Sequence, residues 1–335
     1  MNYVAEQYAA LREGTGYYPV AASLVKLTGL ERGELLRLVL ARDSQYAEPG
    51  SARESLILDD TAAVWDVVTH IEQDETSWLI SQSRTDLPDL LASIAERGGL
   101  AEVEIIDAAP GWIAIAFEGP KAWELAAQLV DSDVSSLVLH GATGVTLPGT
   151  DAGGVLARIG STGEYGYLLL APAEFGAGAW ARAQSAREIG AQALRRARTE
   201  VRHPQIPAQS HGLTVREADL EWLVDWNRED EFLGSRALKE LPPPARGLIA
   251  VSADRNLVQG ARVEAGGRPI GTIQLIAPLD GADHQLALAL VDKPFDVPGL
   301  TLASLDEAGS ETTALTLASP TVSPRSWTGE LGGGR

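Results

Sequence analysis

Two ionisable residues, Asp66 and His70, lie four positions apart in the apolar stretch VWDVVTHIE, and both types suit proton transfer. The alternation of this stretch predicts a β-strand, whose even spacing puts both side chains on one face. A carboxyl group between Trp65, Val67 and Val68 would be desolvated, which raises its pKa and suits a general acid, an effect worth ~10²–10⁴ in rate. The plainer alternatives are an aspartate bonded to the hairpin backbone and a half-solvated histidine at the strand end.

A second set of residues that could take part in chemistry consists of basic side chains. Four arginines occur between Arg195 and Arg202, where they could bind a carboxylate or another anion. The alternative, which we favour for Arg195 and Arg198, is a solvated helix end. His203 and His211 could act as acid or base groups, but they lack a third ligand, so no metal site is predicted. The chain has no phosphate-binding glycine loop and no nucleophile elbow.

The composition excludes several classes of protein. The chain has 335 residues and a net charge of -19, from 46 acidic and 27 basic residues, which disfavours nucleic acid as a partner. The absence of cysteine excludes disulfides, thiolate nucleophiles and zinc–thiolate sites. The N-terminus lacks the features of a signal peptide. The sequence has no run of about 18 apolar residues, which is the length that a membrane-spanning helix needs. We therefore expect a soluble, cytoplasmic protein without membrane contact.

The elements that must position these residues follow from periodicity. A hairpin is predicted at ESLIL and AAVWDVVTHIE, around the turn Asp59–Thr61, and a helix at TDLPDLLASIAERGG, capped by Asp86. Strands are predicted at VLARIGS and YGYLLLAP, followed by one or two helices between 173 and 198. Beyond the prolines 242–244, six short strands at close spacing are typical of a small β-barrel or sandwich.

Several stretches together resemble a known family. STGEYGYLLLAP, AFEGPKAWELAAQL, DEFLGSRAL and LILDDTAAVWDVV are similar, in this order, to segments of the glycine-cleavage T-protein, the tetrahydrofolate-dependent aminomethyltransferase. The resemblance implies an α+β fold, a three-domain cloverleaf around a central cavity with a C-terminal β-barrel. It implies a discontinuous first α+β domain at 1–45 and 143–230, an inserted α+β domain at 46–142, and the barrel at 245–330.

The resemblance also assigns roles to residues. With a one-residue gap near Thr61, Asp66 matches the second aspartate of a family pair beside the folate nitrogen, and Trp65 takes the place of the first. Ser81 falls where the family often has an asparagine that contacts the pterin, and Arg196 matches an arginine that would bind an anionic group. The remaining substrate- or folate-binding candidates are Val68, Glu164, Tyr167, Leu168, Trp222 and Trp226. For Glu164 we favour a structural role in its turn, and for one of the two tryptophans a structural role in a core.

Departures from the family pattern weaken the folate prediction. The glutamate that grips the pterin in the family is Leu168 here, and a preceding family tyrosine is Ser161. Loss of a buried acceptor leaves pterin donors unpaired, at a cost of ~1–3 kcal/mol. In the arginine-rich stretch, an arginine, an aspartate and a glutamate of the family become Gln192, Ala193 and Arg198.

Three functions remain open at this point. The leading hypothesis is a tetrahydrofolate-dependent one-carbon transferase, of methyl or aminomethyl type, that acts on a small molecule. The second is a repurposed enzyme of specialised metabolism that uses the same cavity without folate. The third is a non-catalytic binding module. No protein partner is predicted, because the sequence shows no docking signal for the lipoyl carrier that the resemblance implies.

Overall fold

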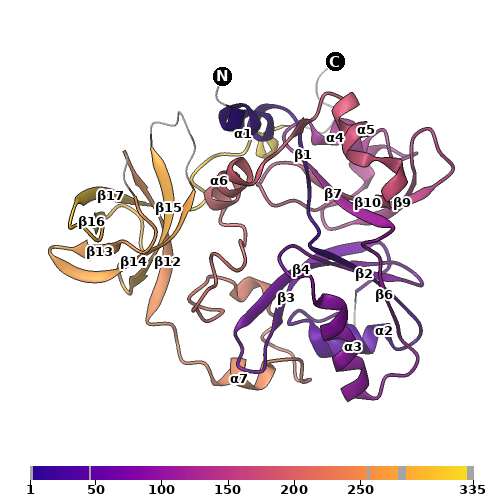
Figure 1. The fold of residues 1–335 in the computed structure, drawn as a ribbon, viewed down its shortest axis with the longest axis horizontal. Coiled ribbons are helices and arrows are strands. Elements are labelled where there is room, and N and C mark those ends of the chain that lie inside the picture. Colours follow the sequence, from indigo (N-terminus) through magenta and orange to yellow (C-terminus); the bar gives the residue numbers. More distant parts are fainter. Residues whose placement is uncertain (1–2, 45–46, 255–256, 278–283, 330–335) are drawn as a thin grey trace.

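The computed structural model describes residues 3–44, 47–254, 257–277 and 284–329. Two β-sheets with their helices lie on one side of the molecule, and a closed β-barrel lies on the other (Figure 1). Between them run helix α6 and the helix-poor segment that leads to α7. The predicted α+β class and the C-terminal barrel are confirmed, and the open choice between barrel and sandwich is decided for the barrel.

The helices are short. They are α1 (Tyr3–Glu13), α2 (Arg32–Val39), α3 (Leu87–Gly98), α4 (Ala122–Ala126), α5 (Ala177–Ala183), α6 (Ala191–Val201) and α7 (Ser235–Glu240), with 3₁₀ turns at Val134–Ser136, Ala173–Phe175, Glu221–Leu223 and Arg325–Trp327. Helix α3 ends as predicted at Gly99, which adopts the left-handed conformation with φ 67°. Its expected cap is wrong, because the Asp86 carboxylate accepts from Arg84 instead of from the helix backbone.

One sheet has six strands in the order β11-β1-β7-β10-β9-β8. Its strands are β1 (Gly16–Pro19), β7 (Trp112–Glu118), β8 (Ala142–Thr146), β9 (Gly153–Ala157), β10 (Gly166–Pro172) and β11 (Arg187–Glu188). The other sheet has five strands in the order β3-β4-β5-β2-β6 and is antiparallel throughout. Its strands are β2 (Ser23–Thr28), β3 (Ser51–Leu58), β4 (Val64–Glu72), β5 (Ser77–Ser81) and β6 (Glu104–Asp107).

The sequence predicted a first domain at 1–45 and 143–230 and an inserted domain at 46–142. The strands of the two sheets do not follow these bounds. Strand β2, from the first expected segment, pairs with β5 and β6, whereas β7, from the inserted one, pairs with β1 and β10. The five-stranded sheet therefore takes residues 23–107. The sheets face each other through one apolar cluster, in which Leu24 and Ile80 meet Ala114 and Leu168. This packing fixes the walls of the site described below.

The barrel closes in the order β12-β15-β14-β13-β16-β17, with β12 also paired to β17. Its strands are β12 (Arg246–Ala253), β13 (Arg262–Ala265), β14 (Arg268–Ala277), β15 (Gln285–Asp292), β16 (Thr301–Leu305) and β17 (Glu311–Leu317). They lie within the range 245–330 expected from the sequence. No helix in the described ranges is long and apolar enough to cross a membrane.

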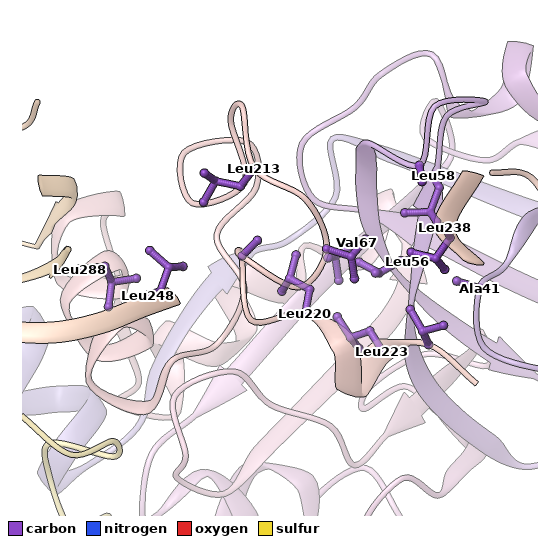
Figure 2. Packing of buried hydrophobic residues seen from close by; sticks show 14 of the residues in the cluster. Ala41, Leu56, Leu58, Val67, Leu213, Leu220, Leu223, Leu238, Leu248 and Leu288 are labelled. Atoms are coloured by element: carbon purple, nitrogen blue, oxygen red, sulfur yellow. The ribbon is translucent and has the colours of Figure 1, made fainter. Parts of the chain in front are cut away.

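The helix-poor segment between α6 and α7 is buried rather than loose. Its leucines Leu213, Leu220 and Leu223 pack between barrel residues such as Leu288 and hairpin residues such as Val67 (Figure 2). All five belong to one cluster of buried side chains. Because burial of apolar surface stabilises by about 25 cal/mol per Å², this cluster holds the barrel and the β3–β4 hairpin in a fixed relation.

Candidate functional site

Two adjoining cavities lie between the two sheets and helix α6. The larger, which we call the outer cavity, has a volume of about 290 Å³, and the smaller, the inner chamber, has about 30 Å³. They share the side chains of Tyr18, Val20, Gln82 and Arg198. A volume of 30 Å³ holds roughly two water molecules, whereas the outer cavity is close to the lower limit of small-molecule sites, about 300 Å³.

Asp66, the predicted acid, borders the outer cavity. It is fully buried, and its carboxylate accepts hydrogen bonds from Ser81 Oγ and, at 2.7 Å, from Ser83 Oγ. Burial raises the pKa of the Asp66 carboxyl above its ordinary value, although these hydrogen bonds oppose the shift. Ser81, predicted to contact a ligand, thus holds Asp66 in place.

The neighbours of Asp66 divide between the two faces of β4. Val67 lines the outer cavity, whereas Val68 is buried in the core beneath helices α2 and α3. Trp65 packs against that same core, with the Arg84 guanidinium 4.6 Å from its ring centroid. Trp65 and Val68 are therefore not among the lining residues, although both were predicted to bind the ligand.

The expected relay between Asp66 and His70 does not form. His70 is buried, and its Nε2 lies 3.0 Å from Glu72 Oε2, which also accepts from Ser77 Oγ. The other Glu72 oxygen pairs with Arg32 at 3.1 Å. Four residues of strand separate Asp66 from His70 by ~13 Å, too far for direct proton transfer. His70 belongs to a structural network at the far end of β4.

A buried carboxylate that the sequence analysis missed lies at the end of β7. Glu118 accepts hydrogen bonds from the Tyr18 hydroxyl, from the amide and hydroxyl of Ser161, and from the amide and hydroxyl of Thr162. Burial and the charge of Glu118 raise the pKa of Tyr18 far above its ordinary value. Five donors saturate the roughly four acceptor positions of a carboxylate, so Glu118 has none left for a ligand. Its place at the end of an alternating strand, directly before Gly119, was the only sequence signal.

The glycine-rich turn before β10 delivers the Ser161 and Thr162 donors to Glu118. A Cβ on Gly166 would lie 2.4 Å from the Gly160 Cα, so only glycine allows the two backbones to approach here. Glu164 does not reach the cavities. Its carboxylate accepts from the amides of Arg325 and Ser326 and ties the C-terminal segment to the turn.

Tyr167 and Leu168 point to opposite faces of β10. Tyr167 is fully buried in the core of the six-stranded sheet, and its hydroxyl has no partner among the described residues. Burial raises its pKa to about 12. Leu168 borders the inner chamber, where it lies with Ile80 and Ile159. That wall of the chamber is therefore apolar.

Helix α6 presents different arginines from those predicted. Ala191, Leu194, Arg195 and Arg198 face the outer cavity, as expected for positions three and four apart. Arg196, the predicted anion-binding residue, lies on another face. Its Nε donates to Glu200 Oε1 at 2.8 Å, and its Nη1 donates to the His284 carbonyl of the barrel at 3.3 Å.

Arg198 lies where the two cavities meet. Its Nε donates to Ser161 Oγ at 3.0 Å, and its guanidinium lies 5.6 Å from the Tyr18 ring centroid. Across the chamber, Glu54 Oε1 lies 2.9 Å from His203 Nε2. Burial tends to raise the pKa of Glu54, but His203 and Arg198 lower it below the ordinary value. This buried contact between Glu54 and His203 was also missed from the sequence.

The predicted tryptophans lie elsewhere. Trp222 and Trp226 are 49% and 37% exposed and line neither cavity. The Arg216 guanidinium covers the Trp226 ring at 4.9 Å. His211 is exposed. Among the described residues no group of three or more histidines and carboxylates could hold a metal ion.

The same architecture occurs in known proteins. The model of the GCVT N-terminal domain matches residues 1–228. The chain belongs to the GCVT family. An aminomethyltransferase of Streptomyces coelicolor is 28% identical over 322 residues, which are 91% of this chain and 86% of that protein. One of Thermus thermophilus is 26% identical over 303 residues, 88% of this chain and 84% of the other.

A solved structure of another protein has the same fold as this GCVT-family chain. The crystal structure of glycine cleavage system aminomethyltransferase T from Bartonella henselae superposes with a TM-score of 0.81 at 20% identity. The match covers 96% of this chain and 90% of that one. The predicted α+β fold of the aminomethyltransferase type is confirmed by this likeness.

Tetrahydrofolate, which the GCVT family implies, can be tested against the side chains of the inner chamber. A pterin needs buried acceptors for its amino and ring N–H groups. Leu168 offers none, Glu118 is saturated by five protein donors, and one Glu54 oxygen already binds His203. The second Glu54 oxygen and the Gln82 amide oxygen come from separate side chains, so they do not replace one carboxylate that accepts two bonds. The chamber also has room for roughly two water molecules. The residues present do not fit a pterin in this chamber.

Proposed function

We propose that this chain is an enzyme of the GCVT family that transfers a small group to or from a molecule held in the outer cavity, without a buried pterin. Aminomethyl transfer, named for its relatives, supplies the reaction class. The observation that carries the proposal is the inner chamber, which is small and is lined by Leu168 and Arg198. A family protein with an open outer cavity, and with Leu168 in place of the carboxylate that the resemblance implies for the pterin, is best explained as one with another ligand.

Asp66 is the proton donor in this proposal. Its raised pKa keeps more of the carboxyl protonated than an exposed aspartate would allow. Ser81 and Ser83 hold it at the cavity wall, so a proton can be delivered at a fixed place once a ligand lies beside it. General acid catalysis of this kind is worth ~10²–10⁴ in rate.

The second candidate is tetrahydrofolate-dependent one-carbon transfer. Family membership over residues 1–228 favours it, as does an outer cavity near the lower size limit of small-molecule sites. In that case the pterin would lie in the outer cavity, beside Gln82 and Leu194.

A thermal-shift screen separates the two candidates. We expect small metabolites to raise the melting temperature where tetrahydrofolate and its formyl and methyl derivatives do not, because a ligand at 100 times its Kd stabilises by about 2.7 kcal/mol. A folate shift as large as that of any metabolite would select the second candidate.

Turnover of a metabolite identified in this way then tests the acid. Asp66→Asn should lower kcat by about 10²-fold or more, while the exposed control Asp60→Asn leaves it unchanged. Full activity of Asp66→Asn would remove Asp66 from the mechanism, whereas binding of the metabolite without any turnover by the wild-type chain would favour a binding module.

A further inference from the structure

Two arginines face the outer cavity and form no direct ion pair with any described residue. Arg195 and Arg198 are one helical turn apart on α6 and both line the cavity. The Arg195 guanidinium has no hydrogen bond or ion pair with any residue in the described ranges. Arg198 uses only its Nε, toward Ser161, so its two Nη groups have no hydrogen-bond partner among the described residues. These unused guanidinium donors can bind an anionic ligand in the cavity.

The nearby carboxylates are held by other groups, although the charge of Arg198 acts on Glu54 across the chamber. Glu118 is enclosed by five hydrogen-bond donors, and Glu54 binds His203. The Asp66 carboxyl is held by Ser81 and Ser83. No ion pair joins any of these three groups to Arg195 or Arg198 within the described part of the chain. The two guanidinium groups are therefore available to a ligand.

The rest of the wall indicates what the ligand carries besides its charge. The Gln82 side chain borders both cavities and makes no hydrogen bond with another described residue, so its amide can both donate and accept. Val20, Leu194 and Ile206 supply apolar surface. A volume of about 290 Å³ limits the ligand to a compact molecule.

We propose that the outer cavity binds a small carboxylic acid, whose carboxylate lies between Arg195 and Arg198 and whose second polar group meets Gln82. A planar guanidinium matches the two oxygens of a carboxylate, which favours this anion over a neutral amide. The inference names the substrate class of the proposed function and rests on it.

Two departures from the family pattern support this assignment. The resemblance places a glutamate at the position of Arg198 and a tyrosine at that of Ser161. Here both positions contact each other, because the Arg198 Nε donates to the Ser161 hydroxyl at 3.0 Å. The short serine leaves room for the guanidinium and accepts its hydrogen bond. The charge at the junction of the cavities is thus reversed from negative to positive.

Calorimetric titration of the full chain with succinate, its neutral analogue succinamide and inorganic phosphate tests the proposal. We expect succinate to bind and succinamide to be at least about tenfold weaker, since the neutral diamide loses the charge-assisted contacts with both arginines. Arg198→Met should weaken succinate by about tenfold or more and Arg195→Met by several-fold. The exposed Arg236→Met, which makes the same charge change far from the cavity, should leave the affinity unchanged.

Equal binding of succinate and succinamide, preference for phosphate, or unchanged affinity in both cavity variants would overturn the proposal. If Arg198→Met does not fold, Arg195→Met decides alone, because its side chain is exposed and without structural contacts among the described residues. Tetrahydrofolate in the same titration tests the proposed function separately. Tight folate binding defeats the proposed function, whereas retained succinate affinity in the arginine variants defeats only the carboxylate assignment.

Discussion

The Nε of Arg198 donates a hydrogen bond to the hydroxyl of Ser161, 37 positions earlier in the chain, at 3.0 Å. The same hydroxyl donates to the buried carboxylate of Glu118 at 2.9 Å. Helix α6, the glycine-rich turn and strand β7 are thereby joined at the point where the inner chamber meets the outer cavity. Ser161 fixes the direction of an arginine whose remaining donors are free for a ligand.

Ser161→Ala should therefore affect both stability and binding. We expect a loss of about 1 kcal/mol in the free energy of unfolding, measured by urea titration, because one buried hydroxyl network is broken. Succinate affinity should fall as well, since the guanidinium loses its anchor. The exposed Ser310→Ala serves as the control and should change neither quantity. Unaltered succinate binding in Ser161→Ala would show that the anchor is not needed.

Glu118→Gln tests the buried carboxylate as a structural centre. An amide nitrogen cannot accept the donors that now face one oxygen, so at least two buried polar groups lose their partners. We expect the free energy of unfolding to fall by about 3 kcal/mol, and Tyr18→Phe to cost only about 1 kcal/mol. Both are measured by urea denaturation. A smaller loss in Glu118→Gln than in Tyr18→Phe would contradict the assignment.

The raised pKa of Asp66 predicts a stability that falls with pH. Between the unfolded pKa, about 3.9, and the higher folded pKa, the native state binds more protons than the unfolded state, so the free energy of unfolding decreases as pH rises through this window. Asp66→Asn should remove this part of the decrease in urea midpoints between pH 4 and pH 8. The variant Asp60→Asn should keep it. Parallel curves for wild type and Asp66→Asn would exclude a raised pKa.

The lowered pKa of Glu54 predicts the opposite dependence of stability on pH. Because its folded pKa is lowered, its pairing with His203 stabilises the protein above the unfolded pKa, about 4.3, and the contribution is lost as pH falls through the folded pKa. Glu54→Gln should be less stable than wild type at pH 7, with a difference that shrinks on acidification. The exposed Glu307→Gln should show no such trend. A constant difference across pH would mean that charge plays no part.

Much of the fold followed from local pattern. The β3–β4 hairpin, helix α3 and the barrel strands carry their own periodicity and turn residues, so they were predicted from the sequence. The sheet to which β2 and β7 belong was not, because pairing partners far apart in the chain leave no local signal.

The candidate site was predicted only in part. Asp66 and Leu168 border the cavities as expected, since alternation along a strand sets their direction. Arg196 was chosen over Arg198 by resemblance, and a shift of two positions on a helix turns a side chain by about 200°. Glu118 and Glu54 escaped notice because only tertiary contacts reveal that a strand carboxylate is buried.

The most direct test of the whole account is a calorimetric titration of the wild-type chain with tetrahydrofolate. The account predicts no saturable heat at millimolar ligand, because the inner chamber is small and Leu168 stands where the family resemblance implies a carboxylate that holds the pterin. Saturation with a micromolar Kd, accompanied by competition from succinate, would contradict it and restore folate to the cavity.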